Sequence, residues 1–436
     1  MSRDALSWRL TPLEAMARWP ASVPLAALVS GDDSPWSRWS VLAVPGAWES
    51  LPAGATRTAC IDWLRQRTRS ARDGATPFDG AWLLQLGYEL GAALEPATNA
   101  AARSDEAWPL AQAAPVLAAA VHDARTGRWT RVGDACEAWP AIERAMEQAL
   151  PSASFSLDTM HATSTDEAYA KLVTRTREYI RAGDLFQANV ARLWEGEGHG
   201  HARAFALAAL GHSHARYGAW LETPAGCVAS MSPELFLHAE RDGTVITRPI
   251  KGTRPADADT AEFMRSSKDA AELHMIVDLM RNDLSRACEP GSVRVHEARA
   301  AEPHATVLHG VAQIHGTLRR DRDLADLIAA TFPPGSITGA PKVRAMQVIR
   351  ELEGFDRGPF YGAIGLLGGD GSLSLNVAIR TATLQQHGTA WRVRYAAGCG
   401  IVSDSDPAEE VRETHAKAAV LHRAADALRS ATALAG

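Results

Sequence analysis

Residues 271–286 read AELHMIVDLMRNDLSR, and this stretch predicts a helix with one buried face. Its apolar side chains recur at helical spacing and form a stripe: Met275, Ile276, Leu279 and Met280. Glu272 stands one turn before this stripe, so its carboxylate should lie at the edge of the buried face. Two interpretations stay open, since Glu272 is either a first-turn acid favoured by the helix dipole or a metal ligand at the rim of a cleft.

Other predicted elements surround this helix in irregular order. Further helices are predicted at residues 166–182, 340–353 and 407–428, and the helix quoted above extends over 270–288. Short segments bounded by Gly, Pro and Asp predict strands at residues 37–43, 81–87, 226–231, 245–250, 363–367 and 392–397. The irregular order predicts an α+β fold rather than a regularly alternating parallel sheet.

Tryptophan is concentrated in the first third of the chain, which holds ten of the 13 tryptophans. This shift in composition predicts a connector near residues 151–154, followed by a polar run at 161–165. We therefore expect an N-terminal region over residues 1–155 and a C-terminal region over 156–436, which need not fold independently.

Composition narrows the class of protein. The 436 residues carry a net charge of −6, with 46% apolar and 22% charged residues, so there is no basic footprint for nucleic acid and no polybasic stretch for a membrane surface. The longest apolar runs are too short to span a bilayer, and residues 1–4 do not begin a signal peptide. Five widely spaced cysteines without a CxxC pair indicate reduced thiols. These features favour a cytoplasmic enzyme that acts on small molecules.

A second acidic helix is predicted at residues 407–420, PAEEVRETHAKAAV, with Asp406 as its cap. Glu409 and Glu413 share one face, and Glu413 also faces Lys417. This helix is either a solvated one laced with surface ion pairs or the wall of an anion and metal site. The second interpretation draws on the preceding glycines, Gly398 and Gly400, whose backbone amides can approach a ligand closely. Mg²⁺ suits such a site because it takes few protein carboxylates.

Lys251 follows a predicted strand in the stretch TRPIKGT, residues 247–253. A lysine in a partly closed cleft can lose its proton and act as a nucleophile, whereas a lone surface lysine only extends into solvent. Glu234, in SPELF, lies on the previous strand, and a hairpin would bring it to Lys251 as a general acid with a raised pKa. The loop FPPGSITGAPK at residues 332–342 is either a plain turn or an anion site at the start of the next helix, which Pro341 opens.

Together these segments resemble the chorismate-utilising enzymes. The resemblance is strong over residues 165–425 and rests on ordered motifs: SPELF (232–236), PIKGT (249–253), MIVDLMRND (275–283), VLHGV (307–311), SITGAPK (336–342), YGA (361–363), AIRT (378–381), GCGIV (398–402) and ETHAK (413–417). It implies antiparallel β-sheets sandwiched between outer helices, with the active site in the cleft between the sheets.

The resemblance also implies roles for single residues. Glu272 and Glu413 would hold Mg²⁺ together with the ring carboxylate of chorismate, and His309 would be a catalytic residue beside the ring. The implied substrate-binding residues are Gln187, Thr253, Thr338, Tyr361, Arg380, Gly398, Gly400 and Lys417. Arg281, Asn282 and Asp283 are expected to be structural.

Two positions separate the branches of this family. Isochorismate-forming members carry a lysine that activates water where this chain has Gln187, and anthranilate synthases usually carry alanine where it has Lys251. Both positions make the chain similar to aminodeoxychorismate synthase component I, a transferase that delivers an amino group to chorismate on the route to 4-aminobenzoate and folate. The resemblance implies that Lys251 attacks C2 of chorismate with Glu234 as the acid. The alternatives are anthranilate synthase component I and a catalytically silent subunit.

The source of the amino group follows from what the sequence does not contain. The chain has no Gly-x-Cys-x-Gly elbow of a glutaminase. We therefore expect ammonia to be supplied from glutamine by a separate amidotransferase subunit.

Overall fold

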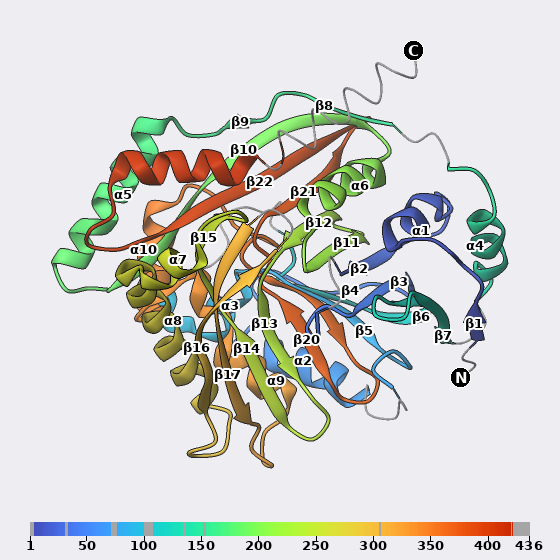
Figure 1. Cartoon of the computed structure of the whole chain (residues 1–436), viewed down its shortest axis with the longest axis horizontal. Helices are drawn as coiled ribbons and strands as arrows, with labels where there is room; N and C mark the ends of the chain where they lie inside the picture. Colours follow the sequence, from blue (N-terminus) through green and yellow to red (C-terminus); the bar gives the residue numbers. More distant parts are fainter. Residues whose placement is uncertain are drawn as a thin grey trace.

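Two antiparallel β-sheets form the centre of the molecule, with helices on the outside (Figure 1). The computed structural model describes residues 4–30, 34–70, 76–99, 108–133, 136–150, 154–304, 307–419 and 421. Across these residues no helix combines the length and the apolar composition needed to cross a membrane. The predicted α+β class and the predicted sandwich of antiparallel sheets are both confirmed.

The first sheet runs from the N-terminal region into the middle and the end of the chain. Its strands, in spatial order, are β1 (Asp4–Leu6), β7 (Arg128–Gly133), β6 (Ala111–Asp123), β3 (Trp39–Pro45), β2 (Ala26–Val29), β11 (Tyr217–Thr223), β12 (Gly226–Ser232), β21 (Thr381–His387), β22 (Ala390–Ile401) and β10 (Gln187–Gly200). Three short strands also pair with β10: β8 (Phe155–Leu157), β9 (His161–Ala162) and β18 (Gly339–Ala340).

The second sheet is joined to the first through β6, which belongs to both. Its order is β4 (Glu49–Leu51), β6, β5 (Trp82–Leu86), β19 (Ala363–Leu367), β20 (Leu373–Asn376), β13 (Leu235–Ala239), β14 (Thr244–Arg248) and β17 (Val307–Thr317). β17 also pairs with β15 (Ile250–Pro255) and β16 (Arg294–Pro303). Apolar side chains of both sheets meet in one core, for example Val41 and Leu221 with Leu83 and Ile364.

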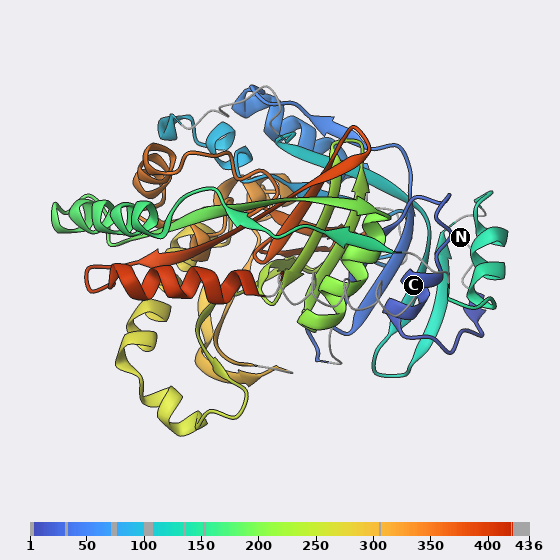
Figure 2. The same cartoon turned by 90° about the horizontal axis from the view of Figure 1, so that it is seen from above.

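Helices cover the outer faces of the two sheets (Figures 1 and 2). The first sheet packs against α1 (Pro12–Arg18), α4 (Trp139–Met146) and α6 (Ala202–Ser213), and its β10–β22 end against α5 (Asp166–Arg181). The second sheet packs against α2 (Arg57–Ser70), α3 (Leu90–Leu94), α8 (Ser267–Ser285) and α9 (Leu324–Thr331), whereas α10 (Lys342–Leu352) packs mainly on the β10–β22 end of the first sheet. The short helices are α7 (Thr260–Arg265), η1 (Pro96–Thr98) and η2 (Gly335–Ile337), and the last described helix spans residues 407–419.

The predicted elements are present, with shifted ends that have local causes. α8 begins at Ser267 rather than residue 270, because the Ser266 hydroxyl caps the helix by accepting from Asp269 N at 3.3 Å. α10 begins at Lys342, so Pro341 is its N-cap rather than its first helical residue. β14 ends at Arg248 because Pro249 has no N–H to donate to the sheet. The end of the last predicted helix, residues 422–428, and most of the predicted connector lie outside the described residues.

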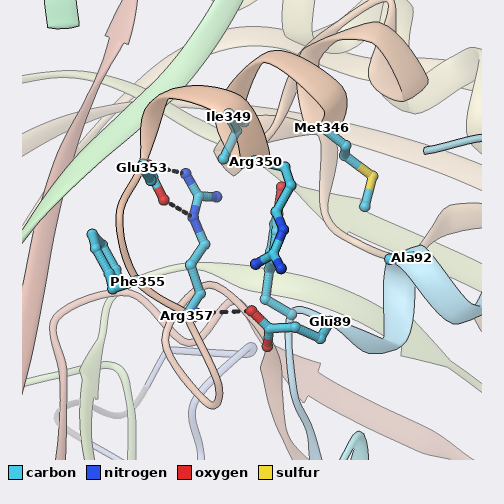
Figure 3. Close-up of a pocket in the computed structure, with 9 residues that line it drawn as sticks. Glu89, Ala92, Met346, Ile349, Arg350, Glu353, Phe355 and Arg357 are labelled. Atoms are coloured by element: carbon cyan, nitrogen blue, oxygen red, sulfur yellow. Dashed lines mark hydrogen bonds and ion pairs between the residues drawn. The ribbon is translucent and has the colours of Figure 1, made fainter. Parts of the chain in front are cut away.

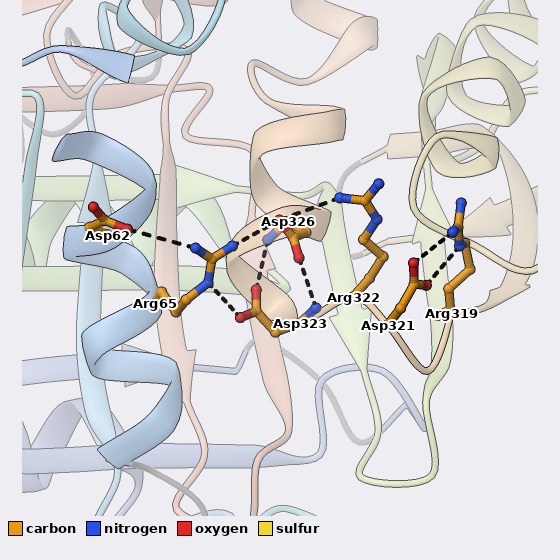
Figure 4. A network of polar contacts seen from close by, with 7 residues as sticks. All are labelled: Asp62, Arg65, Arg319, Asp321, Arg322, Asp323 and Asp326. Atoms are coloured by element: carbon orange, nitrogen blue, oxygen red, sulfur yellow. Dashed lines mark hydrogen bonds and ion pairs between the residues drawn. The ribbon is translucent and has the colours of Figure 1, made fainter. Parts of the chain in front are cut away.

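A polar network ties α2 to α9 (Figure 4). Arg65 of α2 donates to Asp323 at 2.8 Å and to Asp326 at 3.0 Å, and these two acids form the capping box of α9. The network joins the N-terminal region to the C-terminal one. β2 also pairs with β11, and β5 with β19, so both regions share both sheets. The boundary near residue 155 stays a prediction.

Candidate active site

Lys251, Gln187 and Gly400 come together from three different strands, β15, β10 and β22. A Cβ atom added at Gly400 would lie 2.8 Å from Gln187 Nε2 and 3.3 Å from Lys251 Nζ. Gly400 thus leaves room for these two side chains, as a larger residue would not. Gln187 is fully buried, and neither of its amide atoms has a hydrogen-bond partner among the described residues. A buried amide without partners is unusual and marks a place where a ligand can contribute contacts.

Lys251 is surrounded by charges of both signs. Its Nζ donates to Ser336 O of η2 at 3.3 Å. Burial lowers the pKa of Lys251 below its ordinary value, while the carboxylates of Glu272, Glu234 and Glu413 oppose that effect. The lowered pKa favours the neutral amine that a nucleophilic lysine needs. Lys251 is partly buried and its Nζ is held by Ser336 O, so it does not simply extend into solvent as a surface lysine would.

Glu234 lies just before β13, and Lys251 lies just after β14. These two strands form an antiparallel hairpin in which Leu235 pairs with Arg248, so the predicted hairpin is confirmed. The Glu234 side chain is buried, and burial raises its pKa to about 7, although Ser336 and Lys251 partly offset the effect. A carboxyl group with a pKa near neutrality can hold and donate a proton under ordinary conditions.

His309, on β17, pairs with Thr253 of β15, and the Thr253 hydroxyl lies 2.9 Å from His309 Nδ1. Burial is the main cause that lowers the pKa of His309 to about 3, and the positive charge of Arg380 lowers it further. The imidazole is therefore neutral near neutral pH, and its Nε2 has no partner within the described part of the chain. Arg380 has a left-handed backbone, with φ of 51°, which is uncommon for a non-glycine residue and concentrates at functional sites.

Tyr361 and Lys417 meet at the second glycine, Gly398. The Tyr361 hydroxyl donates to Asn189 Oδ1 at 2.7 Å, and it would lie 2.7 Å from a Cβ atom at Gly398. Lys417 donates to Gly398 O at 2.8 Å and forms an ion pair with Glu413 at 2.6 Å. Asn189 was not singled out from the sequence, although it lies two residues after Gln187 and so on the same face of β10.

The acidic residues of the last helix gather around Glu413. The carboxylates of Glu410 and Glu413 and the thiol of Cys399 lie within 4.8 Å of one another. Glu409, which was expected to share a face with Glu413, is exposed and pairs with Arg412 instead. The acid that is buried next to Glu413 is Glu410. The charges of Glu413 and Glu272 both act on Lys251 from different helices. The carboxylate oxygens are the hard donors that Mg²⁺ prefers, whereas the Cys399 thiol is a soft donor, so the carboxylates and not the sulfur would hold the ion.

Other predicted residues serve the scaffold as well. Thr338 is fully buried, and its hydroxyl donates to Pro334 O at 3.0 Å within its own loop. Asp283 forms a buried ion pair with Lys342 at 2.6 Å, which links the MRND segment to SITGAPK and agrees with its expected structural role. Arg281 pairs with Asp278 on the surface. The role of Thr338 as a substrate contact stays a prediction.

A buried cluster of polar side chains around Arg357 and Glu353 holds the backbone of β10, the strand that carries Gln187 (Figure 3). Arg357 donates to Asn189 O at 2.7 Å and to both carboxylate oxygens of Glu353, which also accepts from Ala191 N. Glu89 accepts from the backbone N–H groups of residues 357 and 358 at 2.8 and 2.9 Å, and burial raises its pKa to about 7. These contacts fix the strand that carries Gln187 and Asn189.

Comparison with known proteins places this geometry in a family. A family model described as chorismate binding enzyme matches residues 40–423. The chain is 36% identical over 373 residues to aminodeoxychorismate synthase component 1 of Klebsiella aerogenes, covering 80% of this chain and 78% of the relative. It is 33% identical to the protein of that name from Escherichia coli, covering 94% and 96%.

Other relatives carry a different name. The chain is 42% identical over 276 residues to an anthranilate synthase component 1 of Haloarcula marismortui, but covers only 55% of that relative and 62% of itself. Among solved structures, anthranilate synthase component I of Streptococcus pneumoniae superposes with a TM-score of 0.77 at 26% identity, covering 97% and 99% of the two chains. The menaquinone-specific isochorismate synthase of Escherichia coli, at 18% identity and a TM-score of 0.71, has the same fold.

Proposed function

The chain belongs to the family of chorismate binding enzymes, and we propose that within it the chain converts chorismate and ammonia to 4-amino-4-deoxychorismate. The observation that carries this proposal is the position of Lys251. Its Nζ lies beside Gln187 and Gly400, its pKa is lowered, and Glu234 is near enough to act on its charge. An amine poised next to a proton-holding carboxyl group suits nucleophilic catalysis with general acid assistance.

The proposed reaction has two displacement steps. In the first, the neutral Lys251 amine forms a bond to C2 of chorismate, the two ring double bonds move from C1=C2 and C5=C6 to C1=C6 and C4=C5, and the C4–O bond breaks. The hydroxyl leaves as water with a proton from Glu234. In the second, ammonia bonds to C4 and gives a proton back to the Glu234 carboxylate, the two double bonds return to C1=C2 and C5=C6, and Lys251 leaves from C2 as the free amine. The product has an amino group where chorismate had a hydroxyl. Covalent catalysis replaces one difficult displacement by two easier ones.

The carboxylates of chorismate need positive partners. Glu272 and Glu413 would hold Mg²⁺, which supplies a positive charge that neutralises the ring carboxylate. Arg380, Tyr361 and the backbone amides at Gly398 and Gly400 would bind carboxylate oxygens. Neutral His309, held by Thr253, would offer Nε2 as a hydrogen-bonding group beside the ring.

Ammonia must reach C4 without competition from water. Gln187 carries no charge and cannot act as a base for water, which supports ammonia as the nucleophile. We propose that a separate glutamine amidotransferase subunit delivers the ammonia, as the component 1 names of the relatives suggest. The product would serve the formation of 4-aminobenzoate and folate in the cytoplasm.

The covalent step can be tested by mass spectrometry. The protein is incubated with chorismate and Mg²⁺ without ammonia, quenched and measured intact. We expect an adduct with the mass of chorismate less one water, located on Lys251 by peptide mapping and discharged by ammonium. Lys251→Arg provides the matched control, since it keeps the positive charge but not the nucleophile. If the wild type forms no adduct and Lys251→Ala turns over at the wild-type rate, Lys251 is not the nucleophile.

Anthranilate synthesis is the second candidate, because several relatives carry that name. Anthranilate forms when ammonia adds directly at C2 and pyruvate is then lost. In the proposed mechanism the Lys251 amine bonds to C2, the same carbon that ammonia attacks in anthranilate synthesis. Attack by Lys251 therefore prevents attack by ammonia at that carbon. The presence of lysine here, where anthranilate synthases usually have alanine, favours the first candidate.

A further inference from the structure

A cavity lies among α1, α4 and α6, and none of the residues discussed above as the active site lines it. Its volume is about 350 Å³, within the usual range for small-molecule sites. In Figure 1 these helices lie on the side of the molecule opposite to α8. The cavity therefore requires an explanation of its own.

Arginine side chains line this cavity, and none of the described residues that line it is acidic. Arg18 comes from the last turn of α1 and Arg144 from α4. His201 immediately precedes α6, but burial and the charge of Arg203 lower its pKa and favour the neutral imidazole, so it adds no positive charge. Arg203 also lines the cavity, but its charge is balanced by Glu222 at 2.8 Å. Arg144 is exposed and forms no ion pair with another described residue, so its charge is available to a ligand. The lining thus favours an anion.

The start of α6 adds to this preference. Its N-cap is His201, whose side chain makes no capping hydrogen bond, and Arg203 of the first turn lines the cavity, while Ala204 N already donates to His201 O at 2.8 Å. The first N–H groups of a helix attract negative charge when no side chain caps them. Arg203 also donates to the carbonyls of Trp19 and Val23, which holds the loop after α1 against α6. These hydrogen bonds therefore fix this side of the cavity in the absence of a ligand.

Apart from Gln148, the rest of the lining is apolar. Trp19 and Pro20 form part of one wall, Leu207 part of another, and several alanines keep the space between the helices open. The Trp19 side chain is buried, and its indole N–H has no acceptor among the described residues. A ligand that fits must join a negative group to a compact apolar body.

We propose that this cavity binds a small aromatic carboxylate. The carboxylate lies at the start of α6 near Arg144 and Arg18, and the ring lies against Trp19 and Leu207. The site is separate from the chorismate site and does not depend on which product the enzyme makes.

Calorimetric titration of the full chain with benzoate tests the proposal, with benzamide as the neutral ligand of the same shape and inorganic phosphate as the anion without a ring. Losing a charged contact weakens binding by about tenfold or more. We therefore expect Arg144→Gln to raise the Kd for benzoate by about tenfold. Arg125→Gln, which changes an exposed arginine outside the cavity, should leave the Kd unchanged. Arg380→Gln, in the chorismate site, should also leave it unchanged.

Several results would overturn the assignment. Benzamide binding as tightly as benzoate would show that charge is not recognised, and phosphate binding as tightly would show that the ring is not. An unchanged Kd for benzoate in Arg144→Gln would show that benzoate does not bind in this cavity. A loss of binding in Arg380→Gln alone would place benzoate in the chorismate site instead. Each variant is checked for its melting temperature, so that a folding defect is not mistaken for a binding defect.

Discussion

Gly400 is the residue whose replacement should most directly disturb the arrangement of Lys251 and Gln187. An alanine Cβ there would come within 2.8 Å of Gln187 Nε2, which is closer than side-chain contacts allow. We expect Gly400→Ala to lower kcat/KM for chorismate by about tenfold or more, since a shift of about 1 Å at a reacting group is costly. Gly354→Ala is the matched control, because no atom lies within 4 Å of its added Cβ. Equal activity in the two variants would contradict the proposed placement of Lys251.

Glu234 should give the covalent step a distinctive pH dependence. Its pKa is raised to about 7 by burial, so it holds the proton needed for a general acid below that pH and loses it above. Loss of the Glu234 proton should therefore lower the rate of adduct formation above about pH 7, after an initial rise as Lys251 becomes neutral, so the profile should be bell-shaped. Rapid-quench mass spectrometry measures this rate without interference from the titration of ammonia. In Glu234→Gln the rate should be lower throughout and the decline above neutrality should disappear; an unchanged decline would assign it to another group.

Single residues were predictable where motif and chemistry agreed. Lys251, Glu234 and His309 were singled out from the sequence, and the structure brings Glu234 within electrostatic reach of Lys251 and sets His309 beside Thr253, while their catalytic roles stay predictions. Glu410 was missed because helical spacing alone does not distinguish the buried face from the exposed one at neighbouring acids. Asn189 was missed because its role arises from a contact with Tyr361, which is 172 residues away in the chain.

At the scale of elements, the ends of helices and strands followed local chemistry. Pro249 separates β14 from β15, and the Thr165 side chain caps α5 at its predicted start. The length of β22 was underestimated, because its last residues include Gly398 and Gly400 and glycines weaken a strand pattern. Pairing with β10 keeps these glycines in the sheet, a contact that local sequence does not reveal.

The capping box of α9 should contribute measurably to stability. Asp323 caps the helix and also accepts from Arg65 of α2, so Asp323→Ala removes both contacts (Figure 4). We expect it to lower the free energy of unfolding by about 1 kcal/mol, the usual cost of losing a helix cap. Urea denaturation measures the change. Asp321→Ala removes an exposed pair with Arg319 and should have little effect, so equal losses in both variants would contradict the account.

For the whole molecule, the order of strands could not be predicted from the sequence. Alternating apolar residues indicate a strand but do not name its partner. β2 and β11 pair although nearly two hundred residues separate them, and β6 crosses from one sheet to the other. The site therefore depends on pairing between strands that are far apart in the sequence. The motifs themselves do not reveal this pairing, and only the resemblance to a family implied the fold.

The proposed division of labour between subunits gives another expectation. The chain alone should use ammonium as its nitrogen source but should be inactive with glutamine, because the amide must first be hydrolysed elsewhere. Adding a glutamine amidotransferase subunit from the same cells should restore activity with glutamine. Turnover of glutamine by the purified chain alone would contradict the need for a partner.

The most direct test of the central claim is the identity of the product. The purified chain is incubated with chorismate, Mg²⁺ and ammonium, and the mixture is separated by liquid chromatography before and after addition of a lyase that releases 4-aminobenzoate from 4-amino-4-deoxychorismate. We predict a product that yields 4-aminobenzoate only after the lyase is added. Anthranilate and pyruvate formed without the lyase would contradict the proposed function and support the second candidate.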